Sequence, residues 1–409
     1  MRRVRLVLLY LLISNFCLRT QAAMHRRADP VCCNFTDEGA NYLFTEDCNC
    51  IQNSTIIAKN INANSGVTVS APNIYFTAQT INMNDFHLHA THGISLSTSE
   101  GTQFTDSIIS GTSISISGGS APTLDDCHAV SFLNCSISLL SPPSLLHISG
   151  SSSTNIGCHG ISFEDSYVTD GTIQMEGSGN VGVLVKSSTI IGDNISIIGT
   201  GFDVDGAGVH LEESLVEFAS ANIQGDSESS FGIHLVEPIF TFTDTPGCEL
   251  VLDGTAQTEE EEILVQMDED WELDLFSCSM TVESSLDSNK GISVEGTSES
   301  EFIGHELLRF DGKVDFKLSG STTLYNGIFS TGDIEFDSQS VLCGEITGDK
   351  VRGKQSILAD CAPGISQSAE LNFVGATIHV EDVDGSIPVT MDGTSKVKIQ
   401  GEVSPKKLL

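Results

Sequence analysis

The stretch NIGCHGISFEDSYV, residues 155–168, combines residue types that could do hydrolytic chemistry. It places the Cys158 thiol, the His159 imidazole and two carboxylates, Glu164 and Asp165, beside a Gly-Ile-Ser. Thiols act as nucleophiles, imidazoles transfer protons near neutral pH, and paired carboxylates serve as general acid and base. These residues either form an active site or occupy fixed positions in a structural pattern, and the rest of the chain must decide between the two interpretations.

Two turns place carboxylates where a calcium ion could find oxygen ligands. Asp203 and Asp205 lie in GTGFDVDG, and Asp382 and Asp384 lie in EDVDG. Calcium loops place oxygen ligands in turns in this way, but neither stretch matches an EF-hand or a glycine-rich nonapeptide repeat. Because turns are enriched in Asp and Gly in any case, we predict no cofactor and keep calcium at these four residues as the alternative.

A histidine pair is the remaining candidate for metal binding. His210 in GVHL and His234 in GIHL occupy the same position of a similar phrase, where the side chain is expected to point outward. We interpret them as solvent-facing histidines that stack as a pair, with a metal site as the alternative. The chain contains no nucleophile elbow, phosphate loop or nucleotide-binding fingerprint.

A short phrase recurs along the chain and predicts the fold. Each copy has Gly or Ala first, Ile or Val one residue later, another apolar residue two positions after that, and in most copies a small residue at the end. The copies are GISLSTS (93–99), AVSFLNC (129–135), GISFEDS (160–166), GVLVKSS (182–188), GVHLEES (208–214), GIHLVEP (232–238) and GISVEGT (291–297). Alternation of apolar and polar residues is the period of a strand with one face buried. Repeats of this length with almost no helical pattern predict a solenoid of stacked β-coils.

The repeat also offers a structural explanation for His159. Cys127-His128 and Cys158-His159 precede two consecutive copies, 31 residues apart. Stacked coils would place His159 one rung, about 4.8 Å, from His128. Cys127 would then lie close enough to Cys158 for a disulfide. We therefore favour a place in the pattern over catalysis for His159.

The recurring G-[IV]-x-[LFV] phrase resembles the right-handed parallel β-helix families. These are the pectate lyase-like and polygalacturonase-like enzymes and the filamentous-haemagglutinin-like adhesins. The resemblance covers the chain from about residue 55 to the end and implies an all-β, single-domain parallel β-helix. It also implies that Asp125 and Asp126 form an acid/base pair, with His159 in support and Lys186 as a substrate contact.

The enzymatic set of that family is incomplete in this sequence. Its first Asn-Thr-Asp element is missing, and its arginine beside the substrate-binding lysine is replaced by Leu184. A hydrolytic mechanism that lacks one carboxylate and this arginine cannot be carried over. We predict a non-catalytic protein acting in adhesion, glycan binding or an extracellular coat, with a polygalacturonase-like glycoside hydrolase as the alternative.

The N-terminal region predicts export. Residues 1–22 combine a basic start, an apolar run and a small-residue exit, which is typical of a secretory signal peptide. Residues 23–54 follow as a Cys-rich cap in which Cys32, Cys33, Cys48 and Cys50 are expected to form disulfides, a zinc site being the alternative. Residues 55–409 form the β-helix, with an acidic loop or cap insertion, or a short helix, near 254–272.

Glycosylation motifs and net charge limit the classes of partner that the sequence allows. Four sequons agree with an exported glycoprotein, with their acceptors at Asn34, Asn53, Asn134 and Asn194. Removal of the signal peptide takes away four arginines and no acid, so the net charge changes from −36 to −40. Such a surface repels nucleic acid and anionic lipid. The expected partners are glycans or extracellular and cell-surface proteins, without membrane insertion, and the oligomeric state stays open.

Overall fold

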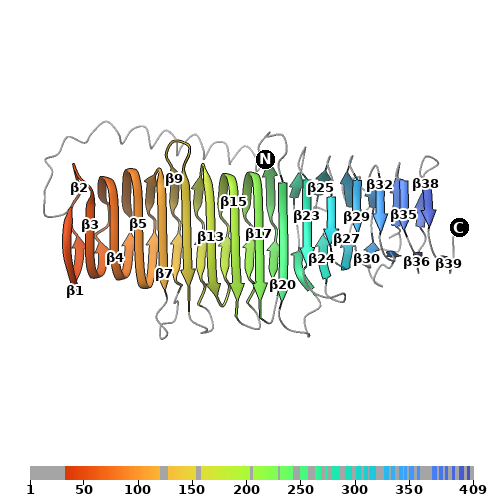
Figure 1. The fold of residues 1–409 in the computed structure, drawn as a ribbon, viewed down its shortest axis with the longest axis horizontal. Coiled ribbons are helices and arrows are strands. Elements are labelled where there is room, and N and C mark those ends of the chain that lie inside the picture. The colour runs from red at the N-terminus through yellow and green to blue at the C-terminus, as the bar shows by residue number, and fades with distance from the viewer. Residues whose placement is uncertain are drawn as a thin grey trace.

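The described chain is built entirely from parallel strands. The computed structural model describes residues 33–119, 128–152, 158–202, 206–228, 231–242 and 249–256, and then the backbone of the strands between 263 and 405. These residues contain 39 strands and no helix, and each strand pairs in parallel with strands of the neighbouring coils. The strands lie across the long axis of the molecule and are stacked along it, from β1 at one end to β39 at the other (Figure 1). The predicted all-β parallel β-helix is confirmed.

Each coil has three faces. Face 1 carries the recurring phrase, and faces 2 and 3 follow in chain order. Six long strands run round a corner and belong to more than one face: β1 (Asn34–Phe44), β3 (Ser54–Ala63), β4 (Val67–Asn84), β5 (Phe86–Thr105), β15 (Thr189–Gly201) and β17 (Leu215–Ser227). Face 1 is otherwise made of β8 (Val130–Leu133), β11 (Ile161–Glu164), β14 (Val183–Lys186), β16 (Val209–Glu212), β18 (Ile233–Val236), β21 (Ile263–Asp268), β24 (Gly291–Gly296), β27 (Lys313–Leu318), β30 (Ser340–Cys343), β33 (Ile357–Ala359), β36 (Val383–Gly385) and β39 (Val403–Pro405).

The other two faces are built in the same way. Face 2 contains β2 (Cys48–Asn49), β6 (Ile108–Gly111), β9 (Ser136–Leu139), β12 (Tyr167–Thr169), β19 (Ile239–Phe242), β22 (Glu272–Asp274), β25 (Glu301–Gly304), β28 (Gly327–Ser330), β31 (Glu345–Thr347), β34 (Leu371–Val374) and β37 (Val389–Met391). Face 3 contains β7 (Ser113–Gly119), β10 (Leu145–Ser151), β13 (Thr172–Gly179), β20 (Glu249–Ala256), β23 (Ser279–Ser284), β26 (Leu308–Asp311), β29 (Asp333–Phe336), β32 (Lys350–Gly353), β35 (Thr377–Val380) and β38 (Lys396–Ile399).

The core consists of stacked columns of like residues. Ile161 pairs in register with Val130 and Val183, and Phe163 pairs with Phe132 and Val185. All six side chains are fully buried, as the two apolar columns of the phrase predict. The Phe132 and Phe163 rings stack with centroids 4.6 Å apart, close to the spacing of the rungs. Alternation with period two therefore becomes one continuous apolar core.

The predicted position of one copy of the phrase is wrong. GISLSTS was expected on the same face as the other copies, but Ile94 pairs with Ile114 on face 3. The rung that precedes Val130 is Thr102, which is fully buried, and the matching stretch is GTQFTDS (101–107). Thr102 is polar, but it occupies an inner position that is apolar in the other copies. The alternation of apolar and polar residues is therefore clearer in GISLSTS, on face 3, than in GTQFTDS, which belongs to face 1.

A ladder of hydroxyl groups holds the turn between faces 1 and 2. The backbone N–H of Ser166 donates to Ser188 Oγ (3.0 Å), and that of Ser188 donates to Ser214 Oγ (3.3 Å). Each Oγ in turn donates to the carbonyl two residues earlier in its own coil. Cys135 takes the next place in the ladder, and its N–H donates to Ser166 Oγ (3.0 Å). The small last residue of the phrase thus satisfies buried backbone groups at the turn.

Two columns of small residues form the corner between faces 3 and 1. A Cβ added at Gly199 would lie 1.8 Å from Gly208 O, and one at Gly177 would lie 2.0 Å from Gly182 O. No side chain larger than hydrogen fits such an approach. Gly182 and Gly208 begin their copies of the phrase, and Gly177 and Gly199 form the column that faces them.

The early coils, residues 54–119, turn this corner differently from the later coils, residues 128–256. Ala58, Ala78 and Thr98 occupy the place that glycine takes later, and β4 and β5 run round the corner as continuous strands. The inner residues Phe76, Leu96 and Ile116 follow one another at intervals of 20 residues, which leaves no room for loops. The later coils are longer and insert residues at this corner.

The structure describes parts of the predicted Cys-rich cap and of the predicted acidic insertion. A disulfide joins Cys33 to Cys50 beside β1, which fits the predicted cap, and Cys48 is also disulfide-bonded. Cys32 and the predicted signal peptide, residues 1–22, lie outside the described residues. Within the acidic segment, residues 263–268 form β21, which pairs with β18 and β24. This part of the segment is a rung of the solenoid and not a loop, cap or helix, because its apolar residues continue the strand alternation.

Candidate functional site

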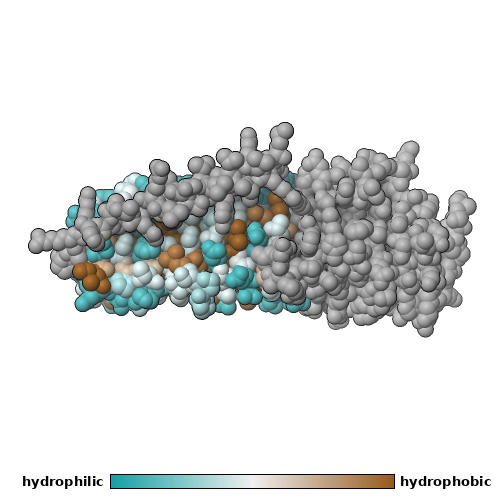
Figure 2. All heavy atoms as spheres, turned by 90° about the horizontal axis from the view of Figure 1, so that it is seen from above, coloured by the Kyte–Doolittle hydropathy of each residue, from teal (hydrophilic) through white to brown (hydrophobic). Residues whose placement is uncertain are grey.

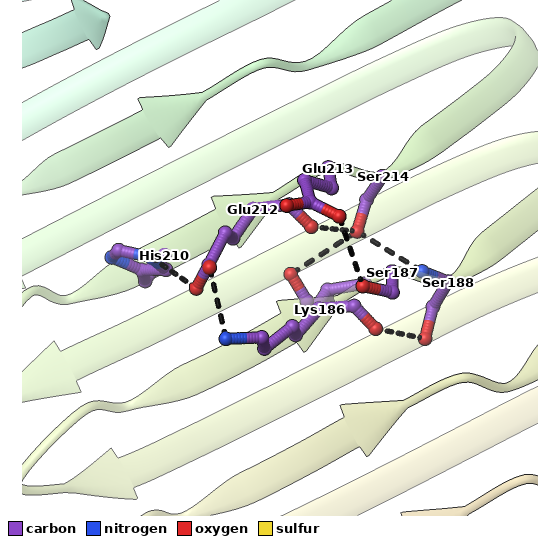
Figure 3. A network of polar contacts seen from close by, with 8 residues as sticks. Lys186, Ser187, Ser188, His210, Glu212, Glu213 and Ser214 are labelled. Carbon is purple, nitrogen blue, oxygen red and sulfur yellow. Dashed lines mark hydrogen bonds and ion pairs between the residues drawn. The ribbon is translucent and has the colours of Figure 1, made fainter.

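A charged network lies on the outward side of face 1 in the later coils. Lys186 at the end of β14 forms an ion pair with Glu212 of β16, with Nζ and Oε1 2.9 Å apart. The other oxygen of Glu212 lies 3.6 Å from His210 Nε2 on the same strand. Figure 3 shows the three side chains converging, next to the hydroxyl ladder that fixes the turn. His234 of β18 packs edge-on against His210, with ring centroids 4.7 Å apart.

The electrostatics of this network favour fixed protonation states at neutral pH. The hydrogen bond from Lys186 holds the pKa of Glu212 below its usual value, and the same bond raises the pKa of Lys186. Burial, followed by repulsion from His234, lowers the pKa of His210 to about 4. The network therefore contains an ionised carboxylate, an ammonium and a neutral imidazole.

This arrangement is not suited to acid/base hydrolysis. A general acid at neutral pH needs a carboxyl group whose pKa is raised, whereas that of Glu212 is lowered. The charge of Lys186 is matched by Glu212, so the lysine does not provide a free positive subsite for an acidic sugar. The network instead connects two coils on the surface.

His159 lies apart from this network and stacks on His128. The two rings are nearly parallel, 10° apart, with centroids separated by 4.8 Å. The N–H of His159 donates to His128 Nδ1 (3.3 Å), and the N–H of Val181 donates to His159 Nδ1 (3.4 Å). His159 precedes the start of β11, whereas Lys186 pairs in register with Glu164 at the end of β11. The structure therefore places His159 and Lys186 at opposite ends of face 1.

Several predicted site residues lie outside the described part of the chain. These are Asp125, Asp126, Cys127, Asp203, Asp205 and Asp382, and of Asp384 only the backbone in β36 is described. The predicted acid/base pair and calcium ligands therefore stay predictions. Cys158 is disulfide-bonded. In the described residues, no three His, Cys, Asp or Glu side chains lie close enough together to hold a metal ion.

Cys135 is the free cysteine of the described residues, and it is buried in the hydroxyl ladder. Burial raises the pKa of its thiol to about 11, so it is protonated and unreactive at neutral pH. Its Sγ donates to the carbonyl groups of Phe104 and Leu133. It thus replaces a ladder serine and is not a nucleophile.

Sequence reasoning missed Glu212 as the partner of Lys186. The fifth position of the phrase carries Glu164, Lys186 and Glu212 in successive coils, and each pairs in register with the next. Opposite charges at the same position of adjacent repeats signal a cross-strand ion pair. This signal was present in the aligned copies.

The early coils contrast with the network, because their surface is almost uncharged. Residues 54–119 contain three carboxylates and one lysine, whereas residues 128–256 contain sixteen carboxylates and one lysine. The outward positions of face 3 in the early coils are Thr55, Ile57, Asn73, Tyr75, Thr77, Gly93, Ser95, Ser97, Ser113, Ser115 and Ser117. Apart from Ile57 and Gly93, these residues carry hydroxyl or amide groups, and none of them is charged.

Hydroxyl and amide groups also bond between coils at this end of the molecule. Asn60 Nδ2 donates to Asn41 Oδ1 (2.9 Å), and Thr80 Oγ1 donates to Asn60 Oδ1 (2.8 Å). The visible surface is hydrophilic or intermediate over most of the described residues, with hydrophobic side chains in small separate groups (Figure 2). Isolated apolar groups of this kind are ordinary on a protein surface.

All four sequon asparagines are exposed, and two of them, Asn53 and Asn194, lie in the same column. Asn34 begins β1, Asn53 precedes β3, Asn134 lies in the turn between faces 1 and 2, and Asn194 begins the face 3 part of β15. No family model matches the chain, and no curated protein matches it. Among the described residues there is no helix with the length and apolar character needed to cross a membrane.

Proposed function

We propose that this chain is an exported, non-catalytic binding glycoprotein that holds neutral glycans on face 3 of its early coils. One observation carries the proposal: an uncharged field of hydroxyl and amide groups on a chain whose mature net charge is −40. A purely solubilising surface would carry its charge evenly, since charge is what keeps a protein hydrated and apart from other molecules. The outward face 3 positions of the early coils lack that charge over four successive rungs.

The chemistry of the field matches that of a neutral sugar chain. Serine, threonine and asparagine side chains offer both donors and acceptors, as sugar hydroxyl groups do. The rungs repeat at about 4.8 Å on a rigid sheet, so the groups are held in position before a ligand binds. An extended polysaccharide along the axis would meet the same groups at every rung, which multiplies weak contacts.

The same charge distribution disfavours acidic ligands. Sixteen carboxylates in the later coils repel polyuronates and nucleic acids before they reach the early coils. Adhesion to a surface coated with neutral glycans is the activity consistent with this pattern. Retention in an extracellular coat would use the same contacts.

Retention on insoluble neutral polysaccharides tests the proposal. We expect the mature chain to be retained by at least one of cellulose, chitin or mannan and not by polygalacturonate. Ser95→Glu and Ser115→Glu place a carboxylate on face 3 of the early coils and should reduce retention at least tenfold. Ser196→Glu is the matched control, because Ser196 continues the same column in the later coils.

Three results would contradict the proposal. The first is no retention by any neutral polysaccharide. The second is equal loss in Ser95→Glu and Ser196→Glu. The third is release of reducing sugars that stops in Asp125→Asn or Asp126→Asn, which would replace a binding function with the polygalacturonase-like hydrolase.

A further inference from the structure

Asn53 stands beside an exposed aromatic ring that is unusual for this surface. Tyr75 lies on the outward side of face 3 and is 43% exposed, while the same column continues with Ser95 and Ser115. An aromatic ring in a column of hydroxyl groups has no neighbour of its own kind to pack on. Its exposed face is available to an apolar partner.

The register places Tyr75 diagonally next to Asn53. Asn53 lies opposite Asn73 of the next coil, because Ser54 pairs with Ile74, and Tyr75 is two residues beyond Asn73 on the same side of the strand. One rung of about 4.8 Å and two residues of about 6.6 Å give a diagonal separation of about 8 Å. A sugar ring attached to Asn53 spans that distance.

The Asn53 amide is held in an orientation that suits modification. Asn73 Nδ2 donates to Asn53 Oδ1 (3.0 Å), which occupies the oxygen and leaves Nδ2 directed away from Asn73. Asn53 is exposed and begins the sequon Asn53-Ser54-Thr55. Asn134 differs, because its own Nδ2 donates to Asp106.

We propose that Asn53 carries an N-linked glycan whose first N-acetylglucosamine stacks on Tyr75. The transfer forms a bond from Nδ2 to the anomeric carbon of a lipid-pyrophosphate-linked oligosaccharide. It breaks the bond from that carbon to the pyrophosphate oxygen and releases one amide proton. The C–H face of the sugar covers the ring while Oδ1 keeps its bond to Asn73. The glycan then lies along the cap end of face 3 and marks the boundary of the neutral field. This inference rests on the proposed export of the chain.

Asn194 provides a control within the same molecule. It lies in the column of Asn53 and Asn73, at the same corner of a later coil. The residues diagonal to it are Gln174 and Asn222, neither of which is aromatic. A glycan at Asn194 therefore has the same attachment without a ring to stack on.

The experiment uses the full chain secreted from a glycosylating eukaryotic cell. Reduction of the disulfides and cleavage after Glu46 separate the Asn53 peptide from that of Asn34, and mass spectrometry after enzymatic deglycosylation in ¹⁸O water reports occupancy at each site. We expect Asn53 to be occupied in most molecules. NMR of ¹³C-labelled glycans should show upfield ring-current shifts in the first N-acetylglucosamine on Asn53 and none on Asn194. Tyr75→Phe should keep these shifts, and Tyr75→Ser should abolish them.

The outcomes separate this inference from the proposed export. Tyr75→Ser introduces the residue found in the next two rungs, so it is compatible with the fold. Occupancy at Asn194 with an empty Asn53, or an occupied Asn53 without ring-current shifts, overturns the stacking alone. Absence of glycan from all four sequons overturns the exported glycoprotein and this inference together.

Discussion

The early and the later coils solve the same packing problem at the corner between faces 3 and 1 with different residues. The early coils place Ala78 and Thr98 inside a continuous strand, and each coil adds only 20 residues. The later coils place Gly177 and Gly199 against Gly182 and Gly208. Insertion of residues at the corner brings two backbone segments into direct contact, and this contact excludes every side chain. Coil length, and not sequence similarity, therefore decides where glycine is required.

The two regions also differ in charge. The early coils expose hydroxyl and amide groups on face 3, whereas the later coils contain sixteen carboxylates, one of which, Glu212, pairs with Lys186 on face 1. Since both regions share the same inner columns, the difference affects the surface and leaves the core unchanged. A solenoid can in this way give each segment its own surface chemistry, because each coil packs only on its neighbours.

The largest expected difference between the two regions concerns the corner. Gly199→Ala would place a Cβ 1.8 Å from Gly208 O, so we expect it to lower the free energy of unfolding by at least about 3 kcal/mol. Ala78→Gly at the equivalent early position should cost only about 1 kcal/mol. Guanidinium unfolding of both variants measures the difference. Equal losses would show that the two corners are packed alike.

Acid should weaken the later coils first. The pKa of His210 is lowered to about 4, so the folded state favours the neutral ring, while the unfolded chain takes up a proton near pH 6.5. The contribution of His210 to the free energy of unfolding is fully present above pH 6.5. It falls by on the order of 2–3 kcal/mol as the pH drops towards 4, and this histidine causes no further loss below that pH. Urea unfolding at pH 7 and pH 4.5 measures the loss.

His210→Gln should remove most of this pH dependence. His147→Gln, on the outward side of face 3, should leave the dependence as in the wild type. A wild-type stability that rises between pH 6.5 and pH 4.5 would contradict the buried neutral histidine.

The hydroxyl ladder gives a smaller contrast. Ser188→Ala removes the acceptor of the buried Ser166 N–H and should cost about 1–2 kcal/mol. Ser99→Ala, in the early copy of the phrase that belongs to another face, should change stability by less than about 0.5 kcal/mol because Ser99 is exposed. Thermal unfolding distinguishes the two. A comparable loss in Ser99→Ala would restore GISLSTS to the ladder.

The smallest effect is expected for the ion pair of the later coils. Lys186→Ala should lower stability by no more than about 0.5–1 kcal/mol, because the lysine side chain is 41% exposed and screened by water. The loss should diminish further in 0.5 M salt. A loss several times larger, independent of salt, would mean that the network contributes more than surface electrostatics.

The phrase at Ile161 and Phe163 was sufficient to predict the coil, since two inward apolar positions recur at a fixed place in each rung. The phrase gave the wrong register at residues 93–107, because Thr102 occupies an inner position although it is polar. Its hydroxyl group is buried and lies 2.9 Å from the hydroxyl group of Thr98, within hydrogen-bond distance. The His128–His159 stack followed directly from the spacing of the repeat. The partner of Lys186 was visible in the aligned copies but required attention to charge as well as to hydrophobicity.

The amino-acid sequence by itself determined the strand period, the inward columns, the small residues at the turns and the acidic character of the chain. These are local properties, which a stretch of seven residues already contains. Only the tertiary structure decided which stretches share a face, that two columns of small residues meet at one corner, and that Tyr75 lies beside Asn53. Such contacts depend on the length of each coil, and residues 20 or more apart become neighbours only when the register of the stacked strands is set.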